Sequence, residues 1–530
     1  MANLFKSLAT GMRRGITALG VGTSNEDVML DLLPEKDSFG GTRTYVIELL
    51  SKAQAGDPQS MFFLAMDYRP GGVLRTDPVK AAKWMGKAAQ LGDAVAQMIF
   101  AYMYWAGEGV PQNYTEAVRW YHASAQQGNS TAAHELALLY DAGRGVQQDY
   151  KQAAYWNVKA ALAGNAAAQN ALGFRLMRGE GMEKDDHAAK WWFEKAAEQG
   201  DADAQYNLGI CHHKGQGVSQ NEVEAAVWYR KAAEQGHADA QFNLGSEYAH
   251  GQGVEQDDAE AVVWFRKAAE QGNVKAQGGL GWCYSTGTGV PKDLAQAFVW
   301  FKKAADQGLA GAQFELGLMF FKGQIVSQDY AQAVVWYSKA AAQGLTTAQL
   351  ALGSCYADGL GVPMDKAKAA VWIRNAADQG DAKAQFILGS LYSVGKIFQK
   401  DDIQAAIWVC KAAEQGDVDA EAFLGFLYYK GKGVTQDYAE AAVWIHKAAE
   451  QDNALAQGFL GGLYGNGEGV KQSNADAYFW LDVSITGLDE AQQHDAIESR
   501  DRAAEKLTPA GLKKVQKRAA KWRTEHPAQS

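Results

Sequence analysis

Small and apolar residues recur along this chain with helical spacing. In the stretch DAQYNLGICHHK, Ala204, Leu208 and Cys211 stand at positions i, i+4 and i+7. That spacing places the three side chains on one face of a helix. The glycines at 215 and 217 follow directly and end the pattern. The stretch therefore predicts an amphipathic helix followed by a tight loop.

A second helix is predicted after the loop. Ala225, Trp228 and Ala232 stand at i, i+3 and i+7, and alanine holds the first of these positions in every repeat of the pattern. Small residues let helices approach closely, and we expect the tryptophan to fill the gap beside them. Truncating such a tryptophan should then cost about 3–5 kcal/mol.

The two-helix pattern returns every 36 residues without an insertion or deletion. A small residue after Leu, or after Phe in one repeat, marks the period, at Ala65, Ala101, Ala137, Gly173, Gly209, Gly245, Gly281, Gly317, Gly353, Gly389, Gly425 and Gly461. Tryptophan keeps the same spacing from Trp84 to Trp480. A fixed period of this length is typical of stacked structural repeats. We predict an all-α fold, a right-handed α/α solenoid of twelve 36-residue helix-turn-helix repeats.

Capping residues support these boundaries. Asp, Asn or Ser precedes every predicted second helix, from Asp77 to Ser473, and these residues are good N-caps. Eight repeats have Glu or Gln three residues later, as at Glu116 and Gln152, which predicts a capping box. A row of aspartates could suggest catalytic acids, but capping accounts for all of them.

The loop between the two helices carries two glycines. The first recurs in all twelve repeats, from Gly71 to Gly467, as expected for a residue with positive φ after a helix. The second is replaced by Val73, Ile325 and Ile397. We therefore expect the second position to be the less strained of the two.

The repeats leave distinct segments at both ends of the 530-residue chain. We expect residues 1–40 to form a flexible N-terminal region with a basic first part, residues 1–22, and residues 41–56 to form a lone second helix that caps the array. The twelve repeats occupy residues 57–488. Residues 489–530 are predicted to form a C-terminal helical cap with a basic tail, including a helix that starts at Thr508.

Charge and hydropathy limit the partners. The net charge of −10 argues against nucleic acid, whose phosphates need a basic face. No apolar run approaches the ~18 residues of a membrane span. We expect a cytoplasmic protein. Residues 1–22 are basic, so export, or contact with a membrane surface through this segment, is the alternative.

The cysteines and histidines are the candidates for disulfide bonds or metal ligands. Cys211, Cys283 and Cys355 occupy one register two repeats apart, too far for disulfides, which predicts buried free thiols. The metal candidates are Cys211, His212, His213, His237 and His250, of which His213 and His250 could be neighbours. They include neither a Cys-x-x-Cys pair nor a His-Glu-x-x-His helix, so we expect no metal and no cofactor.

Enzyme motifs are also missing from the sequence. Nucleophile elbows and phosphate loops do not occur, and the Gly-x-Gly pairs precede an N-cap in every repeat where they appear. We expect no enzymatic activity.

The repeat motif A-x-Q-x-x-L-G-x-x-Y-x-x-G-x-G-V-x-x-D-x-x-x-A-x-x-W-x-x-K-A-A-x-Q-G resembles the Sel-one-like repeat family, relatives of tetratricopeptide repeats. The resemblance covers about residues 57–488, and the closing LTPAGLKK resembles the tails of bacterial members. It implies an α-solenoid that binds proteins, as adaptors and scaffolds do. One branch with paired cysteines in each repeat is associated with β-lactam binding. This chain lacks those pairs.

Two positions of the first helix vary freely between repeats, and tetratricopeptide repeats use the equivalent positions to line a concave groove. They are largely apolar or aromatic. We expect the partner-binding surface to include Tyr102, Trp105, Phe174, Met177, Ile210, His213, Trp282, Leu318, Phe321, Phe426 and Tyr429. The alternative is that some of them pack against adjacent helices.

The sequence thus favours a non-enzymatic scaffold or adaptor that binds proteins or peptides in the groove of a solenoid. The alternative is a protein that binds small ligands or cell-wall fragments, or a degenerate relative of a hydrolase. That class needs a closed pocket with convergent polar groups.

Overall fold

A computed structural model describes residues 41–526, and within this range the chain forms 27 α-helices and one short 3-10 turn. The predicted all-α solenoid of twelve two-helix repeats is confirmed. The expectations for residues 1–40, including membrane-surface contact by residues 1–22, fall outside the described residues, as do residues 527–530.

The array begins with α2 (Gly41–Gln54), which precedes the first repeat. The first helices of the repeats are α3 (Pro58–Asp67), α5 (Ala94–Ala106), α7 (Ser130–Ala142), α9 (Ala166–Arg178), α11 (Ala202–Lys214), α13 (Ala238–His250), α15 (Val274–Thr286), α17 (Ala310–Lys322), α19 (Thr346–Asp358), α21 (Ala382–Val394), α23 (Val418–Lys430) and α25 (Ala454–Asn466). The second helices are α4 (Pro78–Gln90), α6 (Tyr114–Gln126), α8 (Tyr150–Leu162), α10 (Asp186–Glu198), α12 (Glu222–Glu234), α14 (Asp258–Glu270), α16 (Leu294–Asp306), α18 (Tyr330–Ala342), α20 (Lys366–Asp378), α22 (Asp402–Glu414), α24 (Tyr438–Glu450) and α26 (Asn474–Ser484).

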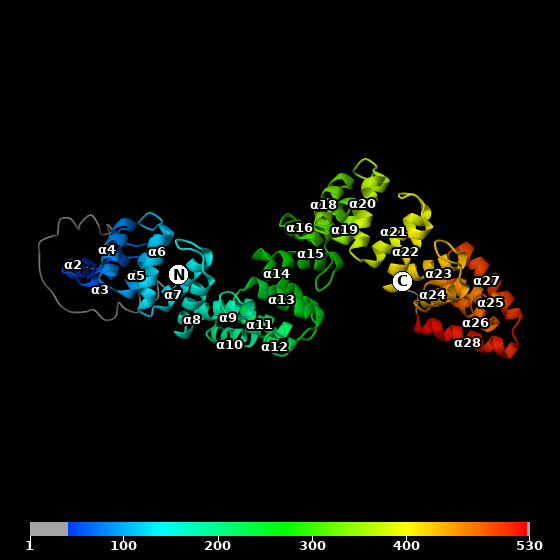
Figure 1. Ribbon diagram of the computed structural model, residues 1–530, viewed down its shortest axis with the longest axis horizontal. Coiled ribbons are helices and arrows are strands. Elements are labelled where there is room, and N and C mark those ends of the chain that lie inside the picture. Colours follow the sequence, from blue (N-terminus) through cyan, green and yellow to red (C-terminus); the bar gives the residue numbers. More distant parts are fainter. Residues whose placement is uncertain (1–40, 527–530) are drawn as a thin grey trace. The chain divides into compact units, whose positions relative to one another are not determined.

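The described residues fall into two compact units, and the boundary between them in the sequence lies between Ala268 and Ala269. In each unit, a helix packs chiefly on the helices directly before and after it in sequence (Figure 1). This pattern of neighbour contacts is what a stacked array of short repeats requires.

The core of each repeat lies between its own two helices. The glycine of the Leu-Gly pair faces the residue that follows the tryptophan: a Cβ on Gly209 would lie 2.6 Å from the ring of Tyr229. Tyr229 and its counterpart Phe193 are almost fully buried. Glycine therefore makes room for a large side chain on the second helix.

The tryptophans are less buried than the sequence suggested. Trp156 and Trp336 are buried, whereas Trp120 and Trp228 are only half-buried. The depth to which the tryptophan is buried therefore varies between repeats, and the next residue along the helix, such as Tyr229, is the one that packs on the glycine of the first helix.

A lysine three residues after the tryptophan covers the exposed face of its ring. The Nζ atom of Lys231 lies 3.7 Å from the ring centroid of Trp228, and Lys447 lies 3.8 Å from that of Trp444. These are cation–π contacts. The lysine of the recurring K-A-A segment thus shields a ring that the core leaves half open.

The predicted N-caps are confirmed in all twelve second helices. In α6, for example, the side chain of Asn113 accepts hydrogen bonds from the backbone N–H groups of Thr115 and Glu116. The predicted capping box is wrong for the repeats. Its second bond needs the backbone N–H of the N-cap residue, which instead donates to the first helix, as from Asn113 to the carbonyl of Tyr104.

The loop glycines reverse the expected order of constraint. Both Gly215 and Gly217 have positive φ, 69° and 67°. A Cβ on Gly215 would meet nothing closer than 3.4 Å, but a Cβ on Gly217 would lie 2.1 Å from the carbonyl oxygen of Asp186 in the preceding repeat. The second glycine is therefore the more constrained one, although Ile325 keeps its left-handed backbone with φ of 68°.

Glutamine side chains join successive repeats. Gln97 of α5 donates to the carbonyl of Ala89 in the preceding repeat at 3.1 Å, and Gln127 after α6 donates to Oε1 of Gln97 at 2.8 Å. The same glutamine pair recurs, as between Gln199 and Gln169. In the repeats that have this pair, the buried glutamine of the first helix links the start of that helix to the ends of two second helices.

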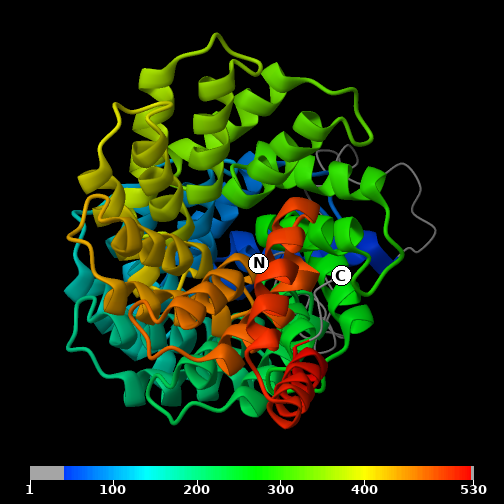
Figure 2. The same ribbon diagram turned by 90° about the vertical axis from the view of Figure 1, so that its right-hand side faces the viewer.

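The C-terminal segment closes the second unit with more structure than a single helix. The turn η3 (Ile485–Gly487) leads to α27 (Glu490–Glu505) and α28 (Pro509–Glu525). Both helices lie against α26, at the orange-to-red end of the chain in Figures 1 and 2. Asp482 of α26 forms ion pairs with Arg500 of α27 and Arg523 of α28.

Candidate functional site

None of the residues expected to line the groove is fully buried. Trp105, Phe174 and Trp282 are exposed by 37%, 37% and 51%. The others are half-buried, namely Tyr102, Met177, Ile210, His213, Leu318, Phe321, Phe426 and Tyr429. These side chains are accessible, as a binding surface requires.

Several of the same side chains also pack on their neighbours, as the alternative held. Tyr102 and Trp105 stack on each other with ring centroids 5.7 Å apart. Phe174 makes an edge contact with the buried ring of Phe193 at 5.6 Å. Phe174 is therefore supported by the second helix of its own repeat, α10, whereas Tyr102 and Trp105 contact each other on α5.

An apolar pocket of about 560 Å³ lies in the second unit. It is lined by Phe386, Asp419, Ala422, Phe423, Phe426, Ile445, Asn453, Leu455, Ala456 and Phe459. Most of these belong to the first helices of three successive repeats, α21, α23 and α25. Among the residues expected in the groove, the pocket contains Phe426.

Sequence reasoning missed the other aromatic walls of this pocket. Phe423 and Phe459 stand two residues before the small residue of their repeats, and Phe386 stands three before it. Their positions also vary between repeats, as Asn207 shows at the register of Phe423. The variability that selected the groove positions would have selected these too.

The polar groups of the pocket are few and adjacent. Nδ2 of Asn453 donates to Oδ1 of Asp419 at 3.1 Å, and both side chains belong to the lining. An apolar recess with one carboxylate at its wall suits a large apolar side chain whose neighbour is basic.

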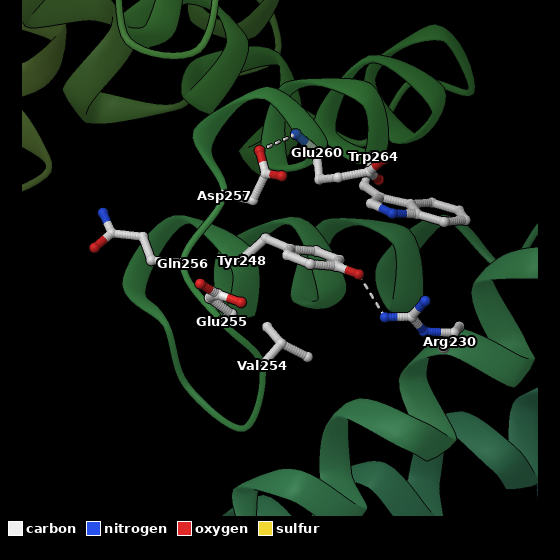
Figure 3. Close-up of a pocket in the computed structure, with 8 residues that line it drawn as sticks. All are labelled: Arg230, Tyr248, Val254, Glu255, Gln256, Asp257, Glu260 and Trp264. Atoms are coloured by element: carbon white, nitrogen blue, oxygen red, sulfur yellow. Dashed lines mark hydrogen bonds between the residues drawn. The ribbon is translucent and has the colours of Figure 1, made fainter.

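A second, more polar recess of about 640 Å³ lies in the first unit (Figure 3). Arg230 donates a hydrogen bond to the hydroxyl of Tyr248, and Asp257 accepts from the backbone N–H of Glu260 at 3.0 Å. Glu255 also lines this recess. Its acidic side chains could attract cationic groups, but Asp257 already serves as an N-cap.

The histidine and cysteine candidates separate in the structure. Cys211 is fully buried, and burial raises the pKa of its thiol to about 12. His237 caps α13 through Nδ1, which accepts from the N–H of Ala240, and Nδ1 of His250 lies 2.8 Å from the carbonyl oxygen of Ser246. The structure therefore does not gather Cys211, His212, His237 and His250 at one point. Burial lowers the pKa of His212.

His213 has different neighbours. Its Nδ1 lies 2.8 Å from Oε2 of Glu222 and 3.7 Å from Oε1 of Glu247. Burial raises the pKa of Glu247 to about 7, with a further contribution from the charge of Glu222. Neither glutamate was singled out from the sequence. Glu247 could have been singled out, because the equivalent position in other repeats holds the apolar residues Cys211 and Leu427, so a glutamate there is unusual.

Comparison with known proteins defines the class. The Sel1 repeat family matches twelve consecutive stretches, the first at residues 58–93 and the last at 454–482. The chain therefore belongs to the Sel1 repeat family, the Sel-one-like family that its motif resembled. A comparison with curated proteins finds no match.

Solved structures agree with this membership. The crystal structure of c5321, described as a protective antigen of uropathogenic Escherichia coli with this repeat fold, is 35% identical. It matches with a TM-score of 0.70 over 85% of this chain and 98% of its own. A Sel1 repeat protein from Oxalobacter formigenes is 30% identical over 71% of this chain and 98% of its own, with a TM-score of 0.44.

None of the described helices is both long and apolar enough to span a bilayer.

Proposed function

We propose that this protein is a non-enzymatic scaffold that binds partner proteins through peptide segments docked on the first helices of its repeats. The observation that carries the proposal is the apolar pocket across α21, α23 and α25. Three successive repeats form it, so its apolar floor continues from one repeat to the next. Sel1 repeat proteins are generally interaction scaffolds, which supports this assignment.

The expected ligand is a peptide with an aromatic or large aliphatic side chain next to a lysine or arginine. Phe423, Phe426 and Phe459 supply the apolar walls, and Asp419 supplies the carboxylate. Aromatic anchors in such pockets contribute most of the energy of a protein interface. The excess of acidic residues in the chain favours a basic partner segment.

A small apolar ligand is the second candidate, because about 560 Å³ is within the usual volume of small-molecule sites. A peptide library displayed on phage separates the two possibilities. Selection on the full chain should enrich peptides with an apolar anchor and an adjacent basic residue. Those peptides should bind at least tenfold more weakly to Phe426→Ala and Phe459→Ala.

The matched control is Val443→Ala, which truncates an exposed apolar side chain of α24 outside the pocket. Peptide affinity should be unchanged in this variant. Failure to enrich any peptide, or equal binding by Phe459→Ala, would overturn the proposal for this pocket.

A further inference from the structure

Three side chains from three consecutive helices converge on one point in the first unit. His213 lies in the last turn of α11, Glu222 is the first residue of α12, and Glu247 lies near the end of α13. One ligand atom from each residue lies within 4.8 Å of the other two. The convergence joins two repeats, because α13 begins the repeat that follows α11 and α12.

Glu247 is in an unfavourable position for a carboxylate on its own. Its side chain is only 4% exposed, and within the described residues its Oε2 atom has no hydrogen-bond partner. Other repeats place Leu139, Cys211 or Leu427 at this register. Burying a carboxylate without a full set of partners is costly, so the site calls for a further ligand.

The same pair of registers occurs earlier in the array with balanced charges. Asp141 stands at the register of His213, and Arg175 stands at that of Glu247. There the guanidinium of Arg175 pairs with the carboxylate of Asp141. In the later repeats two carboxylates face one imidazole, so the cluster lacks positive charge.

Surrounding groups orient these side chains for coordination. Nε2 of Gln220 donates to Oε1 of Glu222 at 2.8 Å, which leaves Oε2 directed at His213. Such second contacts fix the orientation of metal ligands in known sites. His213 is 39% exposed and Glu222 is 27% exposed, so one side of the cluster is open to solvent.

We infer that His213, Glu222 and Glu247 form a binding site for a single divalent transition-metal ion, with Zn²⁺ the best match. One imidazole nitrogen and two carboxylate oxygens are a donor set that zinc accepts, whereas Mg²⁺ and Ca²⁺ prefer oxygen alone. Ligands about 2.0–2.1 Å from a tetrahedral ion lie about 3.3 Å apart. The distances of 2.8 Å and 3.7 Å from Nδ1 bracket that value.

The ion would balance both carboxylates and leave its fourth position open to water or to a group of a bound partner. This site revises the expectation of no metal, which rested on sequence motifs that draw ligands from one helix. The ligands here come from three helices, and only His213 was a candidate from sequence.

The test is zinc binding by tag-free, full-length protein after treatment with a chelator. Titration calorimetry should find one Zn²⁺ per chain at micromolar concentration, and the affinity should fall at least tenfold in Glu247→Gln and in His213→Ala. Glu222→Gln provides a second carboxylate variant at a more exposed position. Thermal melts of the metal-free variants establish that each is folded.

The matched control is His446→Ala. His446 pairs with Glu450 at 3.6 Å, but it is not part of a cluster of three possible ligands among the described residues. Zinc affinity should be unchanged in this variant. Absence of stoichiometric zinc binding in the wild-type chain, or wild-type zinc affinity in both Glu247→Gln and Glu222→Gln, would overturn the site.

Discussion

Nε2 of Gln451 donates a hydrogen bond to a carboxylate oxygen of Glu421, 2.7 Å away, where other repeats pair two glutamines. Glu421 is only 4% exposed. An ionised carboxylate can accept this bond, but it cannot donate to the preceding repeat, as Gln385 donates to the carbonyl of Ala377. One repeat junction therefore has one hydrogen bond fewer at neutral pH.

Replacing Glu421 with glutamine should stabilise the protein by about 1 kcal/mol at pH 7, through the restored donor. Burial raises the pKa of Glu421, so the folded state holds its proton more tightly than the unfolded state does. Wild-type stability should fall as the pH rises from about 4.5 through the folded pKa. Denaturant unfolding of Glu421→Gln should show a gain that is larger at pH 7 than at pH 4.5, and a gain independent of pH would contradict this account.

Removing a complete glutamine link should have the opposite effect. Gln205 donates to the carbonyl of Ala197 and accepts from Gln235. Gln205→Ala loses both bonds and should lower the free energy of unfolding by about 2 kcal/mol. Gln147→Ala, which removes a glutamine from an exposed loop, is the control and should change stability by less than about 0.5 kcal/mol.

Adjacent aromatic residues on α12 should differ in importance. Tyr229→Ala removes a side chain that is 2% exposed and packed on Gly209, and should cost about 3–5 kcal/mol. Trp228→Ala removes a half-buried ring and its contact with Lys231, and should cost about 1–2 kcal/mol. Thermal melts of both variants would compare the two losses of stability. A larger loss of stability for Trp228→Ala than for Tyr229→Ala would contradict the packing described.

The two loop glycines should differ in their tolerance of alanine. Gly215→Ala places a methyl group at ordinary van der Waals distance from Gln220, 3.4 Å from its backbone nitrogen, and should cost about 1–2 kcal/mol because of the positive φ alone. Gly217→Ala adds a clash with the carbonyl of Asp186, so its cost should be greater. Equal melting temperatures for the two variants would show that the preceding repeat moves to accommodate the methyl group.

Thiol reactivity should follow burial. Burial raises the pKa of Cys211 to about 12 and that of Cys355 to about 11, so little thiolate exists at pH 8. Cys410 is half-buried and donates to Glu414 at 3.5 Å, and its pKa is raised by burial and by the charge and hydrogen bond of Glu414. An aromatic disulfide reagent at pH 8 should label Cys410 first, and Cys211 and Cys355 only after unfolding. Mass spectrometry of the labelled peptides would identify any exception.

Features set by neighbours in sequence were predicted correctly. Asn113 caps α6 because an N-cap needs only the following backbone, and Gly215 has positive φ because the helix ends there. The period predicted the helix pairs. Periodicity gives the buried face of a helix but not the depth of each side chain on it, so it did not show that Tyr229 is more deeply buried than Trp228.

Features that depend on the preceding repeat were not predictable in the same way. Gly217 meets Asp186, and Gln205 meets Ala197, only after the repeats stack. The cluster of His213 with Glu222 and Glu247 has the same origin. Its ligands have no local spacing that a motif could capture.

The uniform 36-residue spacing has a consequence for how such a chain can change over evolutionary time. Most repeats present the same glycine, glutamine and capping groups to the repeat before them and the repeat after them. An in-frame duplication or deletion of one repeat recreates a junction of the kind already present. Gene-level recombination can therefore lengthen or shorten the protein without inventing a new interface, while the variable positions of each copy remain free to diverge.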